Sequence, residues 1–172
     1  EISNKFKKNN LKILNFYCSS YIKTISYKKK FDNKNYLIFL DIGYERTSCF
    51  IFNNNKLEFF QSIPLGGNNI TKDISQILKI NLENSEDLKI KFNVNENNSL
   101  LDQSDSPKIN LYSEIIKKNI SIDVLKEIII ARVEEIMELV VFRSYYIKNL
   151  NISAKIKLVT IGGGSKLLSH NF

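Results

Sequence analysis

The stretch Phe39–Phe52, FLDIGYERTSCFIF, places a short polar turn between two apolar runs. Both runs are rich in β-branched and aromatic residues, which favour strands. The turn opens with Asp-Ile-Gly, but Tyr44, Glu45 and Arg46 then stand where a tight turn or a phosphate loop would favour glycine. We therefore predict two strands joined by a turn. Its three large side chains raise the question of whether the turn can still act as a phosphate loop.

The segments around this turn extend it into a sheet. Strands are predicted at 36–40 and 47–52, and the Asn53-Asn54-Asn55 turn leads into a third strand at Lys56–Gln61. The pattern predicts a three-stranded antiparallel meander. Pro64 ends the sheet, because proline cannot donate a hydrogen bond to the ladder.

Three helices are predicted after the meander. The first lies within 68–80, with Asn68 or Asn69 as its N-cap, and a short second helix covers 85–92, opening at Asn84 or Ser85. The third begins at Ser121 as N-cap. Apolar residues at helical spacing predict its buried stripe: Leu125, Ile128, Ile129, Val133, Ile136, Met137 and Val140.

The two ends of the chain have their own patterns. The N-terminal part predicts a helical start at Lys5–Asn10, a strand at 11–17, a further helix over Tyr17–Ile25 and a polar turn at 31–35. A surface loop or a frayed hairpin is predicted at 93–108. The stretch KLVTIGGGSKL, 157–167, predicts a buried strand, a glycine turn and a helix capped by Ser165.

Composition limits the classes of protein. With 172 residues, 43% of them apolar, the chain can form one sizeable core or two small lobes. Its net charge of +7 comes from scattered lysines, and Lys28–Lys30 is interpreted as a solvated turn, so no nucleic-acid partner is expected. Cys18 and Cys49 fit neither a disulfide framework nor a metal site, which indicates a reducing cytoplasm.

No apolar run is long enough to span a bilayer, and no signal peptide precedes the fold. Since the chain starts at Glu1 without Met and stops inside a predicted helix, we expect a fragment.

Two motifs have the chemistry to contact a phosphate or a metal ion. Residues 162–165, GGGS, lie between a strand and a helix, where backbone N–H groups can bind an anion; a tight connection explains them equally well. Asp41 before Gly43 can hold a hydrated magnesium ion, or else accept hydrogen bonds within an ordinary hairpin turn. His170 is the single histidine and offers no triad, so no catalytic residue is assigned.

The order of the motifs is more specific than any one of them. The strand ending in Asp41-Ile-Gly43 is followed by IPLGGNNITKDISQIL (63–78), ARVEEI (131–136) and TIGGGSKL (160–167). This order resembles the FtsA family of bacterial cell-division proteins, within the actin-like ATPase superfamily. The segment NLKILNFYCSSYIKTISY (10–27) is similar to the one that leads into this domain in that family.

The resemblance implies an α/β chain that is part of an actin-like ATPase fold: the ribonuclease H-like sheet of the second large lobe, with an inserted small α/β lobe. Residues 1–35 would be the end of the first lobe and its connection, and 36–66 the phosphate-loop meander. Residues 67–156 would be the inserted lobe with its return helix, and 157–172 the adenosine-loop segment.

The resemblance also implies ATP and Mg²⁺ as cofactors. Asp41–Thr47 would be the second phosphate loop, with Asp41 also serving the metal ion. The residues expected to contact the nucleotide are Asp41, Gly43, Thr47, Glu86, Lys89, Gly162, Gly163 and Gly164. Of these, Glu86 and Lys89 would contact the ribose and adenine, while the three glycines would back the adenosine. Read without the resemblance, Glu86 and Lys89 are a solvated helical pair.

The phosphate loop departs from the family pattern, which is roughly Asp-x-Gly-Gly-Gly-Thr. Tyr44 and Glu45 occupy later glycine positions, where side chains crowd the backbone, and Glu45 repels a triphosphate unless it turns away. Arg46 can supply a compensating charge. We therefore expect weak ATP hydrolysis at most.

The function implied is that of a cytoskeletal adaptor. It would polymerise head to tail and tether FtsZ to the cytoplasmic face of the membrane at the division site, through a C-terminal helix outside this chain. Arg132 and Glu135 would contact the FtsZ tail, or else form an intrahelical ion pair. The alternatives are a true ATPase or sugar kinase of the same fold, and an actin-like pilus-assembly protein.

Overall fold

The computed structural model describes residues 6–7, 9, 11–31, 36–92, 121–150 and 156–168. The chain divides into two compact units, Glu1–Asp32 and Asn33–Phe172. The predicted boundaries after residues 35, 66 and 156 stay predictions. The loop predicted at 93–108 and the histidine at 170 lie outside the described residues, as does most of the helix predicted at Lys5–Asn10.

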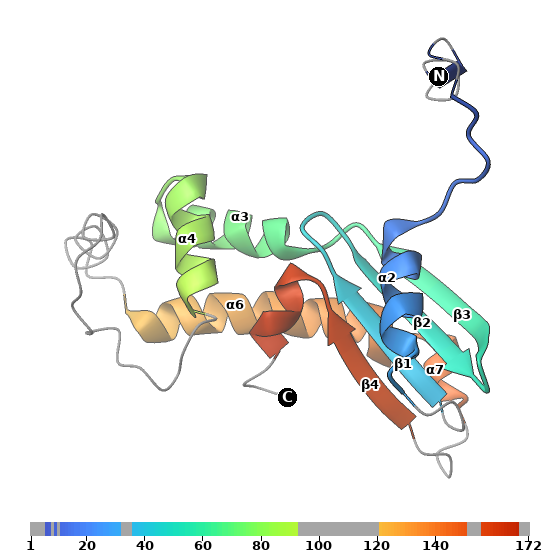
Figure 1. Ribbon diagram of the computed structural model, residues 1–172. Coiled ribbons are helices and arrows are strands. Elements are labelled where there is room, and N and C mark those ends of the chain that lie inside the picture. Colours follow the sequence, from blue (N-terminus) through green and yellow to red (C-terminus); the bar gives the residue numbers. More distant parts are fainter. Residues whose placement is uncertain are drawn as a thin grey trace. The chain divides into compact units, whose positions relative to one another are not determined.

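The first unit contains helix α2, Ser19–Lys28 (Figure 1). The helix begins two residues after the predicted Tyr17 and continues three residues beyond Ile25. The strand predicted at 11–17 is wrong, because residues 11–18 have no regular secondary structure. A strand needs a neighbour to pair its backbone groups, and the described part of this unit contains no strand.

The second unit contains a four-stranded sheet (Figure 1). The strands are β1 Tyr36–Ile42, β2 Thr47–Asn53, β3 Lys56–Ile63 and β4 Ile156–Ile161, in the order β3-β2-β1-β4. The predicted antiparallel meander is confirmed. Strand β4 pairs with β1 in parallel, so that Ile161 lies opposite Asp41. This pairing brings the C-terminal glycine turn next to the β1–β2 turn, although Asp41 and Ile161 are 120 residues apart in the sequence.

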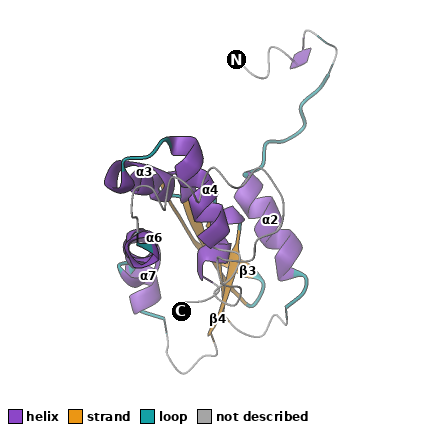
Figure 2. Cartoon of the chain, turned by 90° about the vertical axis from the view of Figure 1, so that its left-hand side faces the viewer, coloured by secondary structure: helices purple, strands orange, loops and turns teal. Residues whose placement is uncertain are grey.

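The described α-helices of this unit are α3 Gly67–Leu78, α4 Leu82–Phe92, α6 Ile122–Met137 and α7 Tyr145–Lys148, and a π-helical turn at Glu138–Phe142 extends α6. The π-helical turn contacts β2 and β3, whereas α3 packs on α4 and α6. Figure 2 views the unit with α6 nearly end-on and α3 and α4 close by. Within the described parts of the chain, no helix has the length and apolar character needed to cross a bilayer.

The core joins alternate residues of β1 and β2 to the apolar side of α6. Ile38, Leu40 and Ile42 of β1 belong to this cluster, together with Ile129 and Val133 of α6. All seven residues of the predicted helical stripe are buried. The 3.6-residue period therefore predicted the buried face of α6 correctly.

Three predicted helix starts need correction. Helix α3 begins at Gly67, and Asn69 instead accepts a 3.0 Å hydrogen bond from the N–H of Gly66. Helix α4 begins at Leu82, because the Asn81 side chain accepts from the N–H of Asn84 at 2.8 Å.

Ser165 is not an N-cap. It lies inside the 3₁₀ turn Gly163–Leu168 and donates its hydroxyl to the carbonyl of Gly162 at 2.7 Å. By contrast, Ser121 caps α6 as predicted, because its side chain accepts from the N–H of Asp123 at 3.2 Å. A capping residue can be recognised from the sequence, but several polar residues near a helix start compete for the role.

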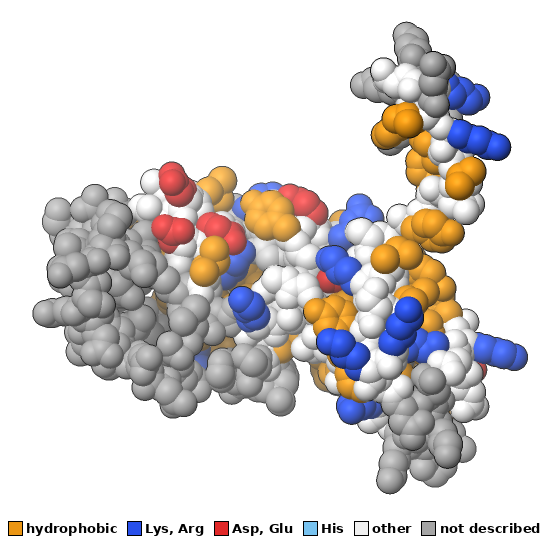
Figure 3. All heavy atoms as spheres, in the orientation of Figure 1, with side chains coloured by type: hydrophobic (Ala, Val, Ile, Leu, Met, Phe, Trp, Pro, Cys, Tyr) orange, Lys and Arg blue, Asp and Glu red, His pale blue; other side chains and the backbone are white. Residues whose placement is uncertain are grey.

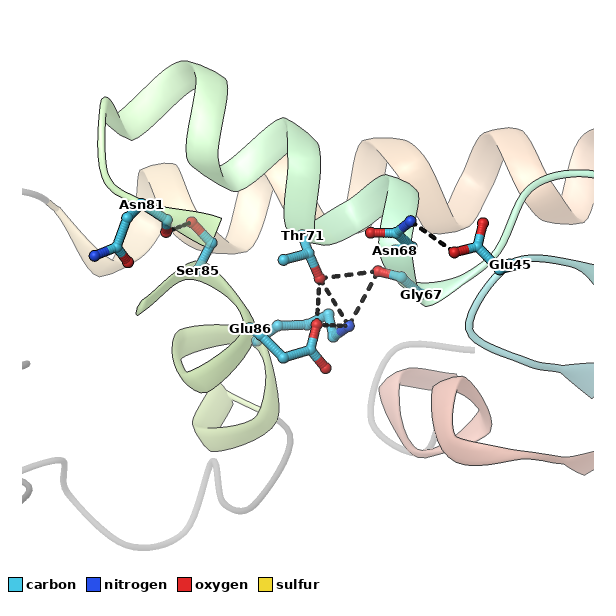
Figure 4. Close-up of polar contacts among 8 residues, drawn as sticks. Glu45, Gly67, Asn68, Thr71, Asn81, Ser85 and Glu86 are labelled. Atoms are coloured by element: carbon cyan, nitrogen blue, oxygen red, sulfur yellow. Dashed lines mark hydrogen bonds and ion pairs between the residues drawn. The ribbon is translucent and has the colours of Figure 1, made fainter. Parts of the chain in front are cut away.

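The β1–β2 turn docks on the start of α3. The N–H of Gly67 donates to Gly43 O at 2.9 Å, and the N–H of Asn68 donates to Tyr44 O at 2.8 Å. The Asn68 amide also donates to the Glu45 carboxylate at 3.0 Å (Figure 4). Two of the unpaired N–H groups at this helix start are therefore satisfied by carbonyls of the turn.

Gly66 makes this close approach possible. A Cβ atom at position 66 would lie 2.6 Å from the carbonyl oxygens of Gly43 and Tyr44 and 2.8 Å from Arg46 N. Because these are backbone atoms, the turn could not move away without breaking its hydrogen bonds to α3. Glycine at 66 thus leaves the space that the backbone of this turn occupies.

Gly66→Ala is expected to destabilise the protein by about 2 kcal/mol or more, because the added methyl overlaps backbone atoms. The matched control is Gly163→Ala, whose Cβ would meet nothing within 4 Å and whose effect is expected to stay within about 0.5 kcal/mol. Urea unfolding followed by circular dichroism measures both. Equal stability of the two variants would contradict the close approach at Gly66.

Candidate functional site

A cavity of about 320 Å³ opens between the β1–β2 turn, the start of α3, helix α4 and the 3₁₀ turn after β4. Its volume lies at the lower end of the range typical of small-molecule sites. The lining includes Gly43, Tyr44, Gly67, Glu86, Lys89 and Gly163. Four segments far apart in the sequence therefore meet at one concave surface.

The predicted nucleotide residues divide into two groups. Gly43, Glu86, Lys89, Gly163 and Gly164 line the cavity. The other three do not. Asp41 is only 2% exposed at the end of β1, and the Thr47 hydroxyl donates to Leu65 O at 2.8 Å.

Gly162 and Gly164 allow the 3₁₀ turn to pack on the end of β1. Gly162 has a φ of 91°, and its Cβ would lie 2.4 Å from Ile42 O and 2.6 Å from the Asp41 carboxylate. A Cβ at Gly164 would lie 2.4 Å from the Ile42 side chain. These two glycines are thus required for packing, whereas Gly163 borders open space.

Lys89 anchors a buried polar network between α3 and α4. Its side chain is 9% exposed, and its ammonium group donates to Gly67 O at 3.0 Å, Thr71 Oγ1 at 2.9 Å and Glu86 Oε2 at 2.6 Å. A lysine ammonium has three N–H donors, so this chain already provides a partner for each. Figure 4 shows the network across the two helices.

Glu86 is the counter-ion of this network. Burial by itself raises the pKa of its carboxyl, but the hydrogen bonds from Lys89 and Thr71 and the charge of Lys89 outweigh burial. The pKa of Glu86 therefore lies below its ordinary value of 4.5. Its side chain remains 33% exposed where it lines the cavity.

Tyr44 contributes its side chain to the cavity rather than to the core. It is 57% exposed, and its ring centroid lies 5.9 Å from Lys89 Nζ. At that distance a cation–π attraction adds to the hold on Lys89. The neighbouring Glu45 carboxylate binds Asn68, so it is turned toward α3.

Arg132 and Glu135 lie on α6, away from the residues that line the cavity. The two side chains form the intrahelical ion pair that was one of the predicted alternatives. Arg132 also holds Asp73 of α3 with two hydrogen bonds of 2.6 and 2.9 Å. This bidentate contact, which raises the pKa of Arg132, ties α6 to α3.

Sequence reasoning missed Thr71 and Asp73 as members of the site and of the helix clamp. Both lie in the quoted block ITKDIS, where the apolar residues alone predict the helix and say nothing about its polar contacts. Two polar residues two positions apart point in different directions from a helix. Here Thr71 contacts α4 and Asp73 contacts α6. The signal in the sequence is that these two polar residues lie on different sides of the predicted helix.

Among the described residues, no group of three His, Cys, Asp or Glu side chains could hold a metal ion. Mg²⁺ needs fewer protein ligands, because it keeps several waters and is commonly shared with phosphate oxygens. Asp41 is buried and does not line the cavity, so a Mg²⁺ ion that it helped to hold would need its other ligands from phosphate and water.

The Lys89 network should make stability depend on pH. Because the folded-state pKa of Glu86 is lowered, its contribution is fully present above about pH 4.5 and is lost as the pH falls through the folded value. Lys89→Met should reduce the fall in Tm between about pH 6 and about pH 3. Lys72→Met removes an exposed lysine of the same helix pair and should leave that fall unchanged. An unaltered fall in Lys89→Met would contradict the linkage.

Comparison with known proteins gives the family. The family model for cell division protein FtsA matches residues 38–169. FtsA of Bacillus subtilis (strain 168) is 35% identical over 113 residues, covering 63% of this chain and 25% of that protein. FtsA of Streptococcus pneumoniae serotype 2 is 30% identical over 99 residues, covering 58% of this chain and 21% of that protein. The chain thus spans about a quarter of the length of the curated relatives it matches.

Solved structures give the fold. A chain of the PilM–PilN type IV pilus biogenesis complex superposes with a TM-score of 0.57 at 18% identity, over 98% of this chain and 41% of that one. MreB 5 of Spiroplasma citri bound to AMPPNP has a TM-score of 0.51 at 13% identity, over 96% of this chain and 52% of that one. At these identities the likeness concerns the fold alone, and the predicted partial actin-like fold is confirmed. Because the family match covers well over half of the sequence, this chain belongs to the FtsA family of cell-division proteins.

Proposed function

We propose that this chain is the nucleotide-binding and partner-binding part of a cell-division adaptor. The adaptor binds ATP with Mg²⁺ as a structural ligand, polymerises head to tail and tethers FtsZ to the cytoplasmic face of the membrane. The observation that carries the proposal is the convergence of Gly43, Glu86, Lys89, Gly163 and Gly164 on one cavity. Membrane attachment would come from a segment outside this chain.

The cavity suits a nucleoside. Glu86 uses its Oε2 atom for Lys89 and Thr71, and a carboxylate has further acceptor capacity for a sugar hydroxyl. Lys89, whose three donors have protein partners, contributes its charge and alkyl stem rather than a new hydrogen bond. Gly163 leaves open space where a base or sugar can approach the backbone.

The β1–β2 turn supports a structural rather than a catalytic use of ATP. Its carbonyls at Gly43 and Tyr44 accept the N–H groups at the start of α3, which are the groups that bind phosphate in many helix-start sites. Glu45 is held by Asn68 and keeps a negative charge that opposes a closely bound triphosphate. The triphosphate of bound ATP carries negative charge beyond what Mg²⁺ neutralises, and positively charged groups elsewhere in the protein would balance it.

The surface around α4 is acidic on the face drawn in Figure 3, where Asp and Glu side chains gather over α3 and α4. Glu83 and Asp87 are exposed residues of α4. Negative charge there repels the phosphate backbone of a nucleic acid.

ATP binding tests the first part of the proposal. The protein containing this chain should bind ATP with Mg²⁺ in calorimetry, and Gly163→Ala should weaken binding by roughly tenfold. The added methyl enters the cavity without touching other protein atoms. A Tyr44→Gly/Glu45→Gly double variant should bind at least as tightly as the parent. Binding by the double variant alone would mean that the turn has lost nucleotide binding, and unchanged binding by Gly163→Ala would place the ligand elsewhere.

We also propose that Arg132 and Glu135 mark the surface that holds the FtsZ tail. An arginine suits an acidic, partly apolar peptide because its planar fork pairs with carboxylates. In this chain Asp73 already occupies two of its donors. Glu135 occupies a third, so a peptide carboxylate can pair with the two remaining N–H donors or displace one of these partners.

A matched pair of variants tests this surface with a labelled FtsZ tail peptide, by fluorescence anisotropy. Arg132→Ala and Asp73→Ala both break the clamp between α3 and α6, but only the first removes the cation. Arg132→Ala should weaken peptide binding roughly tenfold, whereas Asp73→Ala should maintain or strengthen it. Equal weakening by both variants would show that Arg132 acts only on the packing of α3 against α6.

A further inference from the structure

Thr71 is a buried hydroxyl placed between two charged groups. It lies one helical turn after Gly67, is 2% exposed, and contacts both Lys89 and Glu86 (Figure 4). If the hydroxyl had no role, valine, which has nearly the same shape, would fill this buried position equally well. Its hydroxyl therefore requires an explanation in terms of hydrogen bonds.

The hydroxyl works as a relay between the two charges. Its oxygen accepts from Lys89 Nζ at 2.9 Å, and its single hydrogen has two acceptors within reach: Gly67 O at 3.1 Å and Glu86 Oε2 at 2.5 Å. The shorter contact is to the charged acceptor, which forms the stronger hydrogen bond. Thr71 and Lys89 thus both hold the same oxygen of Glu86.

Two donors on one carboxylate oxygen fix the orientation of the whole group. An unrestrained glutamate on a helix surface would exchange among rotamers, and it would lose that freedom on binding a ligand. Here the side chain is 33% exposed, yet it is held from within. Its second oxygen, Oε1, remains available to accept a hydrogen bond from a ligand in the cavity.

We propose that Thr71 is a positioning residue that makes the cavity select ribonucleotides over deoxyribonucleotides, by holding Glu86 ready to accept from a ribose hydroxyl. The inference rests on the proposed nucleotide site and adds a source for its sugar specificity. A site built to bond a substrate hydroxyl discriminates against the analogue that lacks it, because the acceptor is then left unpaired. Thr71 itself touches no ligand.

The experiment measures Kd for ATP, 2′-deoxy-ATP and 3′-deoxy-ATP by calorimetry, using the protein that contains this chain. The parent protein should prefer ATP to one of the two deoxy analogues by roughly tenfold or more. Thr71→Val, which keeps the shape, should bring that preference to within about twofold while leaving the affinity for the deoxy analogue nearly unchanged. Thr71→Ser, which keeps the hydroxyl, should restore it.

Two further variants separate positioning from a general effect on the fold. Ser75→Ala removes a hydroxyl of the same helix that bonds to Ile80 O, outside the cavity lining, and should retain the full preference. Glu86→Gln should abolish the preference, and adding Thr71→Val to it should change nothing more, because both act through one contact. If Thr71→Val does not fold, Thr71→Ala takes its place.

The results distinguish the proposed role of Thr71 from the proposed nucleotide site. ATP binding with an unchanged preference in Thr71→Val overturns the role of Thr71 alone. Equal weakening of all three nucleotides also overturns it, because that pattern indicates only a structural role. A parent protein that binds no ATP overturns the nucleotide site and, with it, this inference.

Discussion

The docking of the β1–β2 turn on the start of α3 is the contact on which the rest of this unit depends. Two backbone hydrogen bonds join Gly67 and Asn68 to the turn. The turn lies so close to Gly66 that a side chain at this position would overlap its backbone. The contact fixes the position and the rotation of α3. Because Thr71 follows one turn later, the direction of its hydroxyl toward α4 is decided at the same place.

Helix α3 in turn connects two regions with different proposed roles. Its Thr71 joins the Lys89–Glu86 network at the cavity, and its Asp73 holds Arg132 of α6. A shift of α3 would disturb both sets of contacts. The buried Lys89 makes such a shift costly, since an ammonium group without its three partners would be left charged and poorly solvated.

The large side chains of the turn are tolerated because they do not occupy the interior. Tyr44 lies 57% exposed at the cavity and Glu45 is bound to Asn68. The backbone of the turn lies close to Gly66, where a side chain would overlap it. Side chains at 44 and 45 are therefore accommodated on the surface while the backbone contact with α3 is kept.

The sequence by itself determined the elements whose signals are local. The β-branched and aromatic runs of β1 and β2, the apolar stripe of α6 and the Ser121 cap follow from strand propensity, helical spacing and capping chemistry, and the order of motifs pointed to the family. The strand predicted at 11–17 failed, because strand formation depends on a partner that local sequence does not provide. Only the tertiary structure decided which residues meet: the parallel pairing of β4 with β1 brings Gly163 to the cavity, and the packing of α3 on α4 and α6 assigns Thr71 and Asp73 their partners. Such contacts join residues far apart in the chain, and no local pattern specifies them.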